Sequence, residues 1–593
     1  VAGKGSLTYK PIKGLSISGI VSPFINYQKK KAFKNSCGYT LPDDPETFGG
    51  YFDSGSTWTT NSLTETRNDD YNVTSQAIAN YMGTFGSHNL TVMAGFENYY
   101  MKSESLGAAR DKYELTGYPY LNIGSEDFQT NSGTGSEYTS NSVFGRVIYS
   151  YADRYLFQAN VRHDGSSRFA KGYRWGTFPS FSAGWVASEE KFMKNLKWDW
   201  LSFLKLRGSW GMLGNERIGS NYFPYIALMS FGNSLFYMAD GSVVSDKTAR
   251  PAVLAVEDIT WETTTSTDLG LDVNFLNNRL QFHFDYYWKE TKDMLLNIEI
   301  PYFMGYNNPS TNAGKMSTHG YDIEVAWNDQ IGDFKYGVNV NFSDFLSKID
   351  YMNDGEQISG GKIKRAGVLF NEFYGYVCEG IYQTQEEVNN SARTSTTVTV
   401  GDLKYRDISG PDGVPDGVIS PEYDRVPLGN SLPRFQYGGS LNASYKGIDF
   451  SLAFQGIGKQ NSYLSTSMVQ PLRDNYGNVP AILEGKYWSP FNTTEENLAA
   501  KYPRLSNVSK SNNYATSNFW MFNGSYFRLK NITLGYTLPK SWTQKAGINR
   551  ARFYVSGSDL FCLSNFPSGW DPEMGTSDYP ITTSLVMGIQ VNF

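Results

Sequence analysis

The sequence predicts an all-β protein, a transmembrane antiparallel β-barrel of about seventeen strands that forms a single domain over residues 1–593. Three observations predict it. Apolar and polar residues alternate along many long segments, the connections between these segments alternate between short and long, and the chain ends on an alternating strand closed by Phe593. Alternation with a period of two places one set of side chains on each face of a strand. A membrane barrel needs this arrangement, with one face for lipid and the other for water.

Composition fits this class and excludes others. Aromatic residues make up 16% of the chain and charged residues only 19%, and 52 basic against 58 acidic side chains leave a net charge of −6. A near-neutral charge argues against a nucleic-acid-binding protein, which would show a basic stripe. The sequence contains no run of about 18 apolar residues, so it predicts no transmembrane helix. The three Cys and four His residues are dispersed, so we expect no disulfide framework and no metal site.

The clearest pair of strands covers residues 269–275 and 280–289, joined by the short turn 277–278. In the second strand an apolar set alternates with a polar set that includes His283 and Asp285. We expect the polar set to face the lumen and the apolar set to face lipid. The apolar set is Leu280, Phe282, Phe284 and Tyr286.

The connections are sorted by length along the chain, as in outer-membrane barrels, whose periplasmic turns are short and whose extracellular loops are long. We predict short turns at residues 11–14, 86–89, 152–154, 277–278, 328–332 and 446–447, with medium ones at 189–200 and 539–549 on the same side. We predict long extracellular loops near residues 31–70, 107–135, 213–262, 292–316, 349–432, 459–524 and 564–580.

Several segments resemble the SusC/RagA family of TonB-dependent outer-membrane transporters of Bacteroidetes. Together they extend from about residue 160 to the C-terminus, and their order along the chain is what makes the resemblance specific. They are RHDGSSRF at 162–169, RWGTFPSFSAGW at 174–185, LKLRGSWGMLGN at 204–215, WE at 261–262 with DLGLD at 268–272, NNR at 277–279 with DYY at 285–287, GDLKYRD at 401–407, SYFRLKN at 525–531 and DPE at 571–573.

The resemblance implies a 22-stranded barrel filled by an N-terminal plug, a TonB box that couples the plug to the inner-membrane TonB complex, and a SusD-like surface lipoprotein that covers the barrel. It also implies an oligosaccharide or peptide ligand and no enzymatic activity. This sequence shows no plug and no TonB box. We therefore expect a plug-bearing N-terminal segment to contribute the remaining strands, Val1 to lie on the outer side, and the strand near residues 3–10 to pair with that segment.

Candidate ligand-binding residues fall into two groups, and no catalytic, cofactor or metal site is predicted. Aromatic side chains in long loops could stack on sugar rings, although packing within the loop or against a partner is the commoner role of such residues. They are Tyr222, Tyr225, Phe236, Tyr237, Tyr374 and Tyr376. Polar side chains expected on the lumenal face could contact ligand, line a hydrated wall or contact the plug. They are Asp272, His283, Asp285, Asp322 and Glu324.

The sequence also offers one candidate calcium-binding loop and two alternative functions. The segment from Asp412 to Asp424 resembles a calcium-binding loop, but Val414 and Tyr423 stand where such loops place ligands. A passive porin or other outer-membrane barrel is the first alternative to a TonB-dependent importer. A soluble, secreted glycan-binding β protein is the second, because strands of soluble sheets alternate too.

Overall fold

The structure is a computed structural model that describes all residues except 42, 52–58, 197, 220–221, 354, 472, 474–477, 507, 576–578 and 580. The parts of the predicted connections 31–70, 189–200, 213–262, 349–432, 459–524 and 564–580 that contain these exceptions lie outside the described residues.

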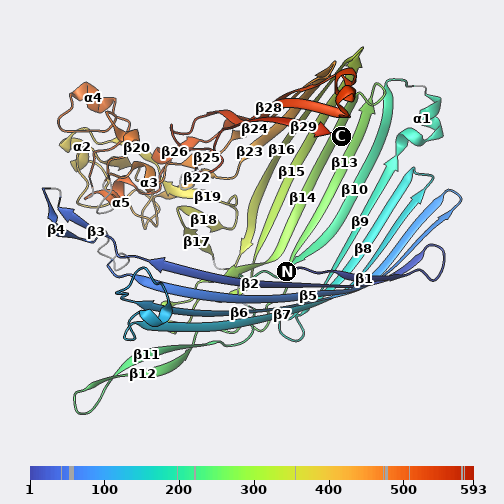
Figure 1. Cartoon of the computed structure of the whole chain (residues 1–593). Helices are drawn as coiled ribbons and strands as arrows, with labels where there is room; N and C mark the ends of the chain where they lie inside the picture. Colours follow the sequence, from blue (N-terminus) through green and yellow to red (C-terminus); the bar gives the residue numbers. More distant parts are fainter. Residues whose placement is uncertain are drawn as a thin grey trace. The chain divides into compact units, whose positions relative to one another are not determined.

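Seventeen strands among the described residues form one sheet, the number that the alternation predicts (Figure 1). They are β1 (Gly5–Tyr9), β2 (Leu15–Lys34), β5 (Ser62–Phe85), β6 (His88–Asp111), β7 (Gln129–Tyr151), β8 (Tyr155–Ser166), β9 (Trp175–Val186), β10 (Leu201–Asn215), β13 (Glu262–Phe275), β14 (Leu280–Asn297), β15 (Ser310–Ile331), β16 (Phe334–Met352), β23 (Arg434–Tyr445), β24 (Ile448–Lys459), β27 (Tyr526–Thr537), β28 (Arg550–Ser564) and β29 (Ser584–Asn592).

The chain divides into two compact units. The first comprises Val1–Ser182, Gly211–Thr264 and Asp293–Asn312, and the second comprises Ala183–Trp210, Thr265–Lys292 and Ala313–Phe593. In the first unit β1, β2, β5, β6, β7 and β8 pair in sequence order, all antiparallel. In the second unit β15, β16, β23, β24, β27, β28 and β29 do the same. Sequential antiparallel pairing is what short turns between neighbouring strands allow.

The strands present one apolar and one polar face, as the alternation predicts. On β16, Val338 and Val340 expose 36% and 39% of their surface, although both are apolar. Between them Asn339 points to the opposite face, where its amide donates a hydrogen bond to Glu324 of β15 at 2.6 Å. An apolar face left open along successive strands is the property that membrane barrels use against lipid.

Several strands extend further than predicted, and the long connections are correspondingly shorter. The predicted loop 31–70 is wrong at both ends, because β2 continues to Lys34 and β5 already begins at Ser62. Cross-strand pairs of polar side chains continue the register there, among them Lys31 with Glu65 at 3.5 Å and Asn68 with Gln28 at 3.0 Å. The turn predicted at 328–332 is similarly displaced, because β15 runs to Ile331. Loss of apolar alternation therefore marks the end of the apolar face and not the end of the strand.

The connections contain smaller sheets and short helices. The short strands are β3 (Gly38–Leu41), β4 (Asp44–Tyr51), β11 (Met229–Tyr237), β12 (Val243–Pro251), β17 (Glu356–Ser359), β18 (Lys362–Arg365), β19 (Glu372–Tyr376), β20 (Cys378–Ile381), β21 (Leu403–Tyr405), β22 (Arg425–Asn430), β25 (Asn461–Tyr463) and β26 (Met521–Asn523). The α-helices are α1 (Lys191–Asn195), α2 (Gln385–Asn389), α3 (Thr466–Val469), α4 (Thr494–Leu498), α5 (Lys510–Asn513) and α6 (Lys540–Thr543). In the part of the chain that the structure describes, no helix has the length and apolar character needed to cross a membrane.

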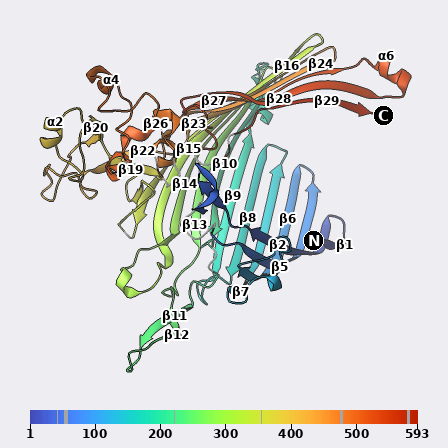
Figure 2. The ribbon, with the colours of Figure 1, turned by 60° about the vertical axis from the view of Figure 1, so that its left-hand side comes forward.

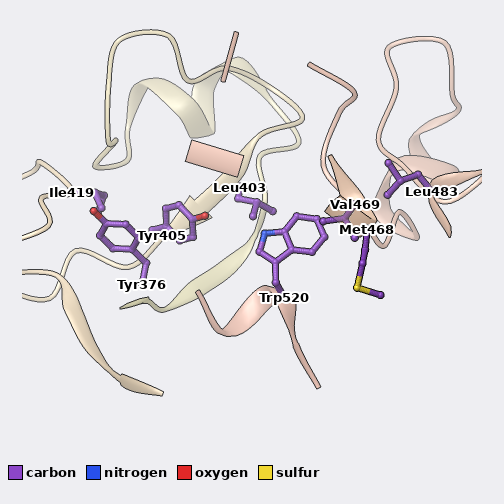
Figure 3. Packing of buried hydrophobic residues seen from close by; sticks show 8 residues of the cluster. All are labelled: Tyr376, Leu403, Tyr405, Ile419, Met468, Val469, Leu483 and Trp520. Atoms are coloured by element: carbon purple, nitrogen blue, oxygen red, sulfur yellow. The ribbon is translucent and has the colours of Figure 1, made fainter. Parts of the chain in front are cut away.

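Two long connections fold together into what we call the loop subdomain, residues 372–430 and 460–524 of the second unit. Figures 1 and 2 show its strands β19, β20, β22 and β26 gathered at one end of β23 and β24. Its core joins side chains from both connections, as Figure 3 shows; they are Tyr376, Leu403, Tyr405, Ile419, Met468, Val469, Leu483 and Trp520. The largest buried apolar cluster of the second unit thus lies in the connections and not between the strands.

Candidate functional site

Three of the predicted polar residues meet around an arginine on the polar face of the second unit. Arg207 of β10 donates from Nε to Asp272 at 3.2 Å and from Nη2 to Asp285 at 2.6 Å. A third acid, Asp268, lies 3.6 Å from the same guanidinium. His283 Nδ1 lies 3.1 Å from Asp272. The structure therefore brings Asp272, His283 and Asp285 together, as their shared parity predicts.

The cation at the centre of this group was missed as a site residue. Arg207 lies in the LKLRG segment that carries the family resemblance, and it sits on a strand distant in sequence from the acids that it binds. A signal was present, because three acids on one face at Asp268, Asp272 and Asp285 need a counter-charge.

The other two predicted polar residues lie further along this face, on β15. Glu324 accepts a hydrogen bond from the Asn339 amide at 2.6 Å, so its partner in the structure is a neutral group. Asp322 lies two residues earlier, on the same face of the strand, opposite Ser343 of β16.

The first unit carries its own charged group on the polar side of β6 and β8. Arg162 donates to Glu97 at 2.9 Å, to Ser142 at 2.8 Å and to Asp164 at 2.7 Å. Glu97 also accepts from Gln76 at 2.5 Å. Arg162 of the RHD segment therefore links β8 to the strands β6 and β7 through side-chain hydrogen bonds.

The predicted loop aromatics have divergent surroundings. Tyr222 packs under the Arg168 guanidinium, 4.3 Å from its ring centroid, and its ring lies 6.1 Å from that of Tyr138. Tyr225 is half-buried. Phe236 and Tyr237, near the tip of the β11–β12 hairpin, expose 46% and 83% of their surface. Phe236 and Tyr237 thus have open faces for contact, whereas Tyr222 is already engaged by the protein.

Tyr374 and Tyr376 lie inside the loop subdomain with only 7% and 5% of their surface exposed. Tyr376 stacks on Tyr405 at a centroid distance of 5.0 Å, and the Arg425 guanidinium lies 5.4 Å from its ring. These two rings pack within the protein, the commoner role considered for them, and in this conformation they offer no face to a ligand.

A buried polar network ties the two halves of the loop subdomain together. Asp402 is fully buried and accepts hydrogen bonds from Arg504 Nε at 2.7 Å, from Asn513 at 2.9 Å and from the Thr399 backbone N–H at 2.9 Å. Asn513 in turn accepts from the Leu403 backbone at 2.9 Å. Because 102 residues separate Asp402 from Arg504, no local sequence pattern predicts this contact.

Ionisable groups in the loop subdomain titrate far from their ordinary values. Burial raises the pKa of Tyr382 to about 12, aided by the charge of Glu387. Burial likewise raises the pKa of the Cys378 thiol to about 11 and that of Tyr405 well above its usual range. These shifts describe a dry interior, and the raised pKa keeps the Cys378 thiol protonated at neutral pH.

A second buried ionic group joins two of the family-like segments. Arg528 of β27 contacts both oxygens of Asp571 at 2.7 Å and reaches Glu573 at 2.6 Å. Lys530 lies 2.7 Å from Asp559, which is also 3.7 Å from Arg528. The SYFRLKN and DPE segments therefore meet, and together they attach the connection between β28 and β29 to the end of β27.

Two carboxylates of the acidic loop considered for calcium are used internally. Asp424 is fully buried and accepts hydrogen bonds from the backbone N–H groups of Ile408, Ser409 and Ser420. Asp416 accepts from the Val418 backbone N–H at 2.9 Å. Within the described residues, no group of three or more His, Cys, Asp or Glu side chains could hold a metal ion.

Comparison with known proteins gives consistent matches over most of the chain. The family model described as "TonB dependent receptor-like, beta-barrel" matches residues 22–556. "TonB-dependent receptor P3" of Formosa agariphila is 30% identical over 560 residues, covering 88% of this chain and 52% of that protein. "TonB-dependent receptor SusC" of Bacteroides thetaiotaomicron is 28% identical over 538 residues, covering 88% of this chain and 50% of that protein.

Among solved structures, "Structure of the RagAB peptide transporter" aligns with a TM-score of 0.81 at 23% identity, covering 100% of this chain and 61% of that one. At this identity the likeness concerns the fold. The chain spans about half the length of the curated relatives it matches.

Proposed function

The chain belongs to the TonB-dependent receptor-like β-barrel family, as a SusC-like protein of the outer membrane, and we propose that it forms the pore of an importer for oligosaccharides, with peptides as the alternative cargo. In this proposal no covalent bond of the cargo is made or broken. The cargo crosses the membrane along the polar face of the sheet, while the apolar face contacts lipid.

The main support for this proposal is the hydrogen-bonded polar face of the sheet. Charged and amide side chains follow one another on this face, from Arg207 with its acids to Glu324 with Asn339. A hydrated wall of paired charges and amides can exchange hydrogen bonds with a water-soluble solute as it passes, whereas an apolar wall would exclude it.

The direction and energy of transport involve parts of the system beyond this sequence. We propose that a plug-bearing N-terminal segment occludes the lumen and receives force from the TonB complex. The relatives that this chain matches are about twice its length, which leaves room for such a segment.

A surface partner is proposed at the end of the sheet that carries the long connections, which we assign to the cell exterior. A SusD-like lipoprotein would close over this end and hold the cargo against it. Two features support this assignment: the ordered loop subdomain, and the exposed aromatic side chains Phe236 and Tyr237 of the β11–β12 hairpin.

The experiment is an uptake assay in cells that carry the full-length gene or its deletion. We expect neutral or acidic oligosaccharides, or else casein peptides, to enter only when the gene is present. A protonophore should abolish this uptake, because TonB draws on the proton-motive force. Uptake that persists with the protonophore would favour a passive porin. Recovery of the protein in the aqueous phase without detergent would favour the soluble glycan-binding alternative.

A further inference from the structure

A neutral, glycine-floored shelf lies on the polar face of β16, β23, β24 and β27. It has a volume of about 520 Å³, and all the side chains around it belong to the second unit. Its centre is a row across three strands in which Asn341 pairs with Gly438, and Gly438 pairs with Gln455. Because paired residues of neighbouring strands point to the same face, the two amides flank the glycine.

The glycine is what makes the shelf hollow. A Cβ at Gly438 would lie only 3.1 Å from the Asn341 side-chain oxygen and 3.3 Å from the Phe454 carbonyl oxygen. A larger residue at this position would therefore crowd the amides and close the space between them. Gly438 is buried, so the surrounding atoms cover most of its small surface.

Rows above and below extend the shelf with further uncharged polar groups. Ser343 pairs with Gln436 on one side of the central row, and Asn339 pairs with Ser440 on the other. In the part of the chain that the structure describes, the side chains of Asn341 and Gln436 have no hydrogen-bonding partner within the protein. Amide donors and acceptors are thus presented to whatever occupies the space.

Two charged side chains border the shelf. Glu324 accepts a hydrogen bond from the neutral Asn339 amide and keeps its negative charge, whereas Arg528, which pairs in register with Gln455, is buried against Asp571. The exposed lining therefore differs from the charged wall around Arg207. A ligand with an anionic end would find no cation among the lining side chains.

We propose that this shelf is a binding subsite for a neutral oligosaccharide in transit; the proposal rests on the importer function above and specifies its cargo. Each sugar hydroxyl donates one hydrogen bond and accepts others, and a side-chain amide can do both. Hydrogen bonds between neutral groups are weak enough to exchange, and a transport path needs sites that release their ligand. A peptide fits less well because its C-terminal carboxylate has no cation to pair with among the lining side chains.

The test uses the full-length receptor, expressed together with its native partners. In it, amide side chains of the shelf are replaced. Asn341→Leu combined with Gln436→Leu removes the donors and acceptors of the two amides that have no partner among the described residues, while keeping similar volume. We expect uptake of glucose and mannose hexasaccharides at limiting concentration to fall about fivefold to fiftyfold, the loss of two hydrogen bonds of ordinary strength. The matched control is Asn72→Leu, an amide on β5 in the first unit, which should leave uptake unchanged at equal surface amount. If the leucine pair does not accumulate at the surface, Asn341→Ala with Gln436→Ala replaces it.

The outcomes separate this proposal from the one it rests on. If the double variant takes up the hexasaccharides as well as the wild type does, the proposal of an oligosaccharide subsite on the shelf is wrong, while the importer function stands. A second result would be protonophore-sensitive uptake of casein peptides or oligogalacturonate with no uptake of any neutral hexasaccharide. This result would also contradict the subsite proposal, while the importer function would stand. Absence of any gene-dependent uptake overturns the importer itself.

Discussion

Arg207 neutralises acidic side chains from two neighbouring strands, and its removal would leave them facing one another. We predict that Arg207→Met lowers the free energy of unfolding by about 1–3 kcal/mol, below the roughly 3–5 kcal/mol for a fully buried pair. The reduction reflects the 31% exposure of the Arg207 side chain, which lets water screen the acids. Denaturant unfolding of the full-length protein in lipid vesicles measures it.

The matched control for that variant is Arg279→Met. Arg279 lies 3.3 Å from Asp329, but its side chain is 46% exposed, so its loss should cost at most about 1 kcal/mol. Equal losses for the two variants would contradict the central role given to Arg207.

Asp402 is a fully buried acid of the loop subdomain, and its partners come from folded backbone or from the second connection. Asp402→Asn removes the charge that Arg504 needs inside a dry core. We predict a destabilisation of about 2–3 kcal/mol within the loop subdomain, below the roughly 3–5 kcal/mol for a fully buried pair because the Arg504 side chain is 25% exposed. Rapid trypsin cleavage at residues 372–430 on intact cells would reveal it. Glu356→Gln, which breaks an exposed pair with Arg365, should leave the cleavage rate unchanged.

Tyr382 makes the loop subdomain sensitive to alkali. Its folded pKa of about 12 exceeds the value of about 10 for an unfolded tyrosine, so its stabilising contribution is complete below pH ~10 and disappears as the pH rises through 12. We therefore predict that Tyr382→Phe reduces the loss of protease resistance between pH 10 and 12. A loss as steep as in the wild type would show that another group controls it.

For single residues, the most informative sequence signal for the polar face is whether they occupy odd or even positions along a strand. It correctly groups Asp272, His283 and Asp285, because side-chain direction follows from period two alone. It does not find Arg207, whose partners come from other strands. Nor does it distinguish the buried Tyr376 from the exposed Tyr237, since both stand in loops whose folding depends on distant contacts.

Among the elements, β14 offers a direct test of which face meets lipid. Phe284 belongs to the apolar set and Asp285 to the group around Arg207. We predict that Phe284→Lys lowers the free energy of unfolding by about 2–4 kcal/mol if it lies near the bilayer midplane. The matched variant His283→Lys places the same charge on the polar face beside Asp272 and should cost much less. Unfolding in lipid vesicles compares the two, and a larger loss for His283→Lys would reverse the facial assignment.

The strand order was predictable because each strand pairs with the next in sequence, and at every second connection a short turn leaves little alternative. Strand ends were not, since polar pairs such as Lys31 with Glu65 continue the ladder beyond the apolar band. The strands of three to five residues in the loop subdomain are below the length at which alternation can be recognised. Long-range packing, and not local pattern, determines them.

For the whole molecule, the sorting of connections predicts a fixed orientation in the membrane. A protease site inserted at residues 391–395, in the loop subdomain, should be cut on intact cells by externally added enzyme. The same site inserted at the turn Asn277–Asn278 should be cut only after the outer membrane is permeabilised. The opposite pattern would place the loop subdomain in the periplasm and exclude contact with a surface lipoprotein.

The loop subdomain also has a consequence for how such proteins diversify. Its core and its buried Asp402–Arg504 pair are shared between two stretches of sequence that lie on either side of the β23–β24 hairpin. A recombination event that exchanges one stretch between related genes would bring together an acid and an arginine selected in different backgrounds. The two stretches should therefore be inherited as a block that includes the intervening hairpin, and gene chimaeras with a crossover inside that block should be recovered less often than those with crossovers on either side.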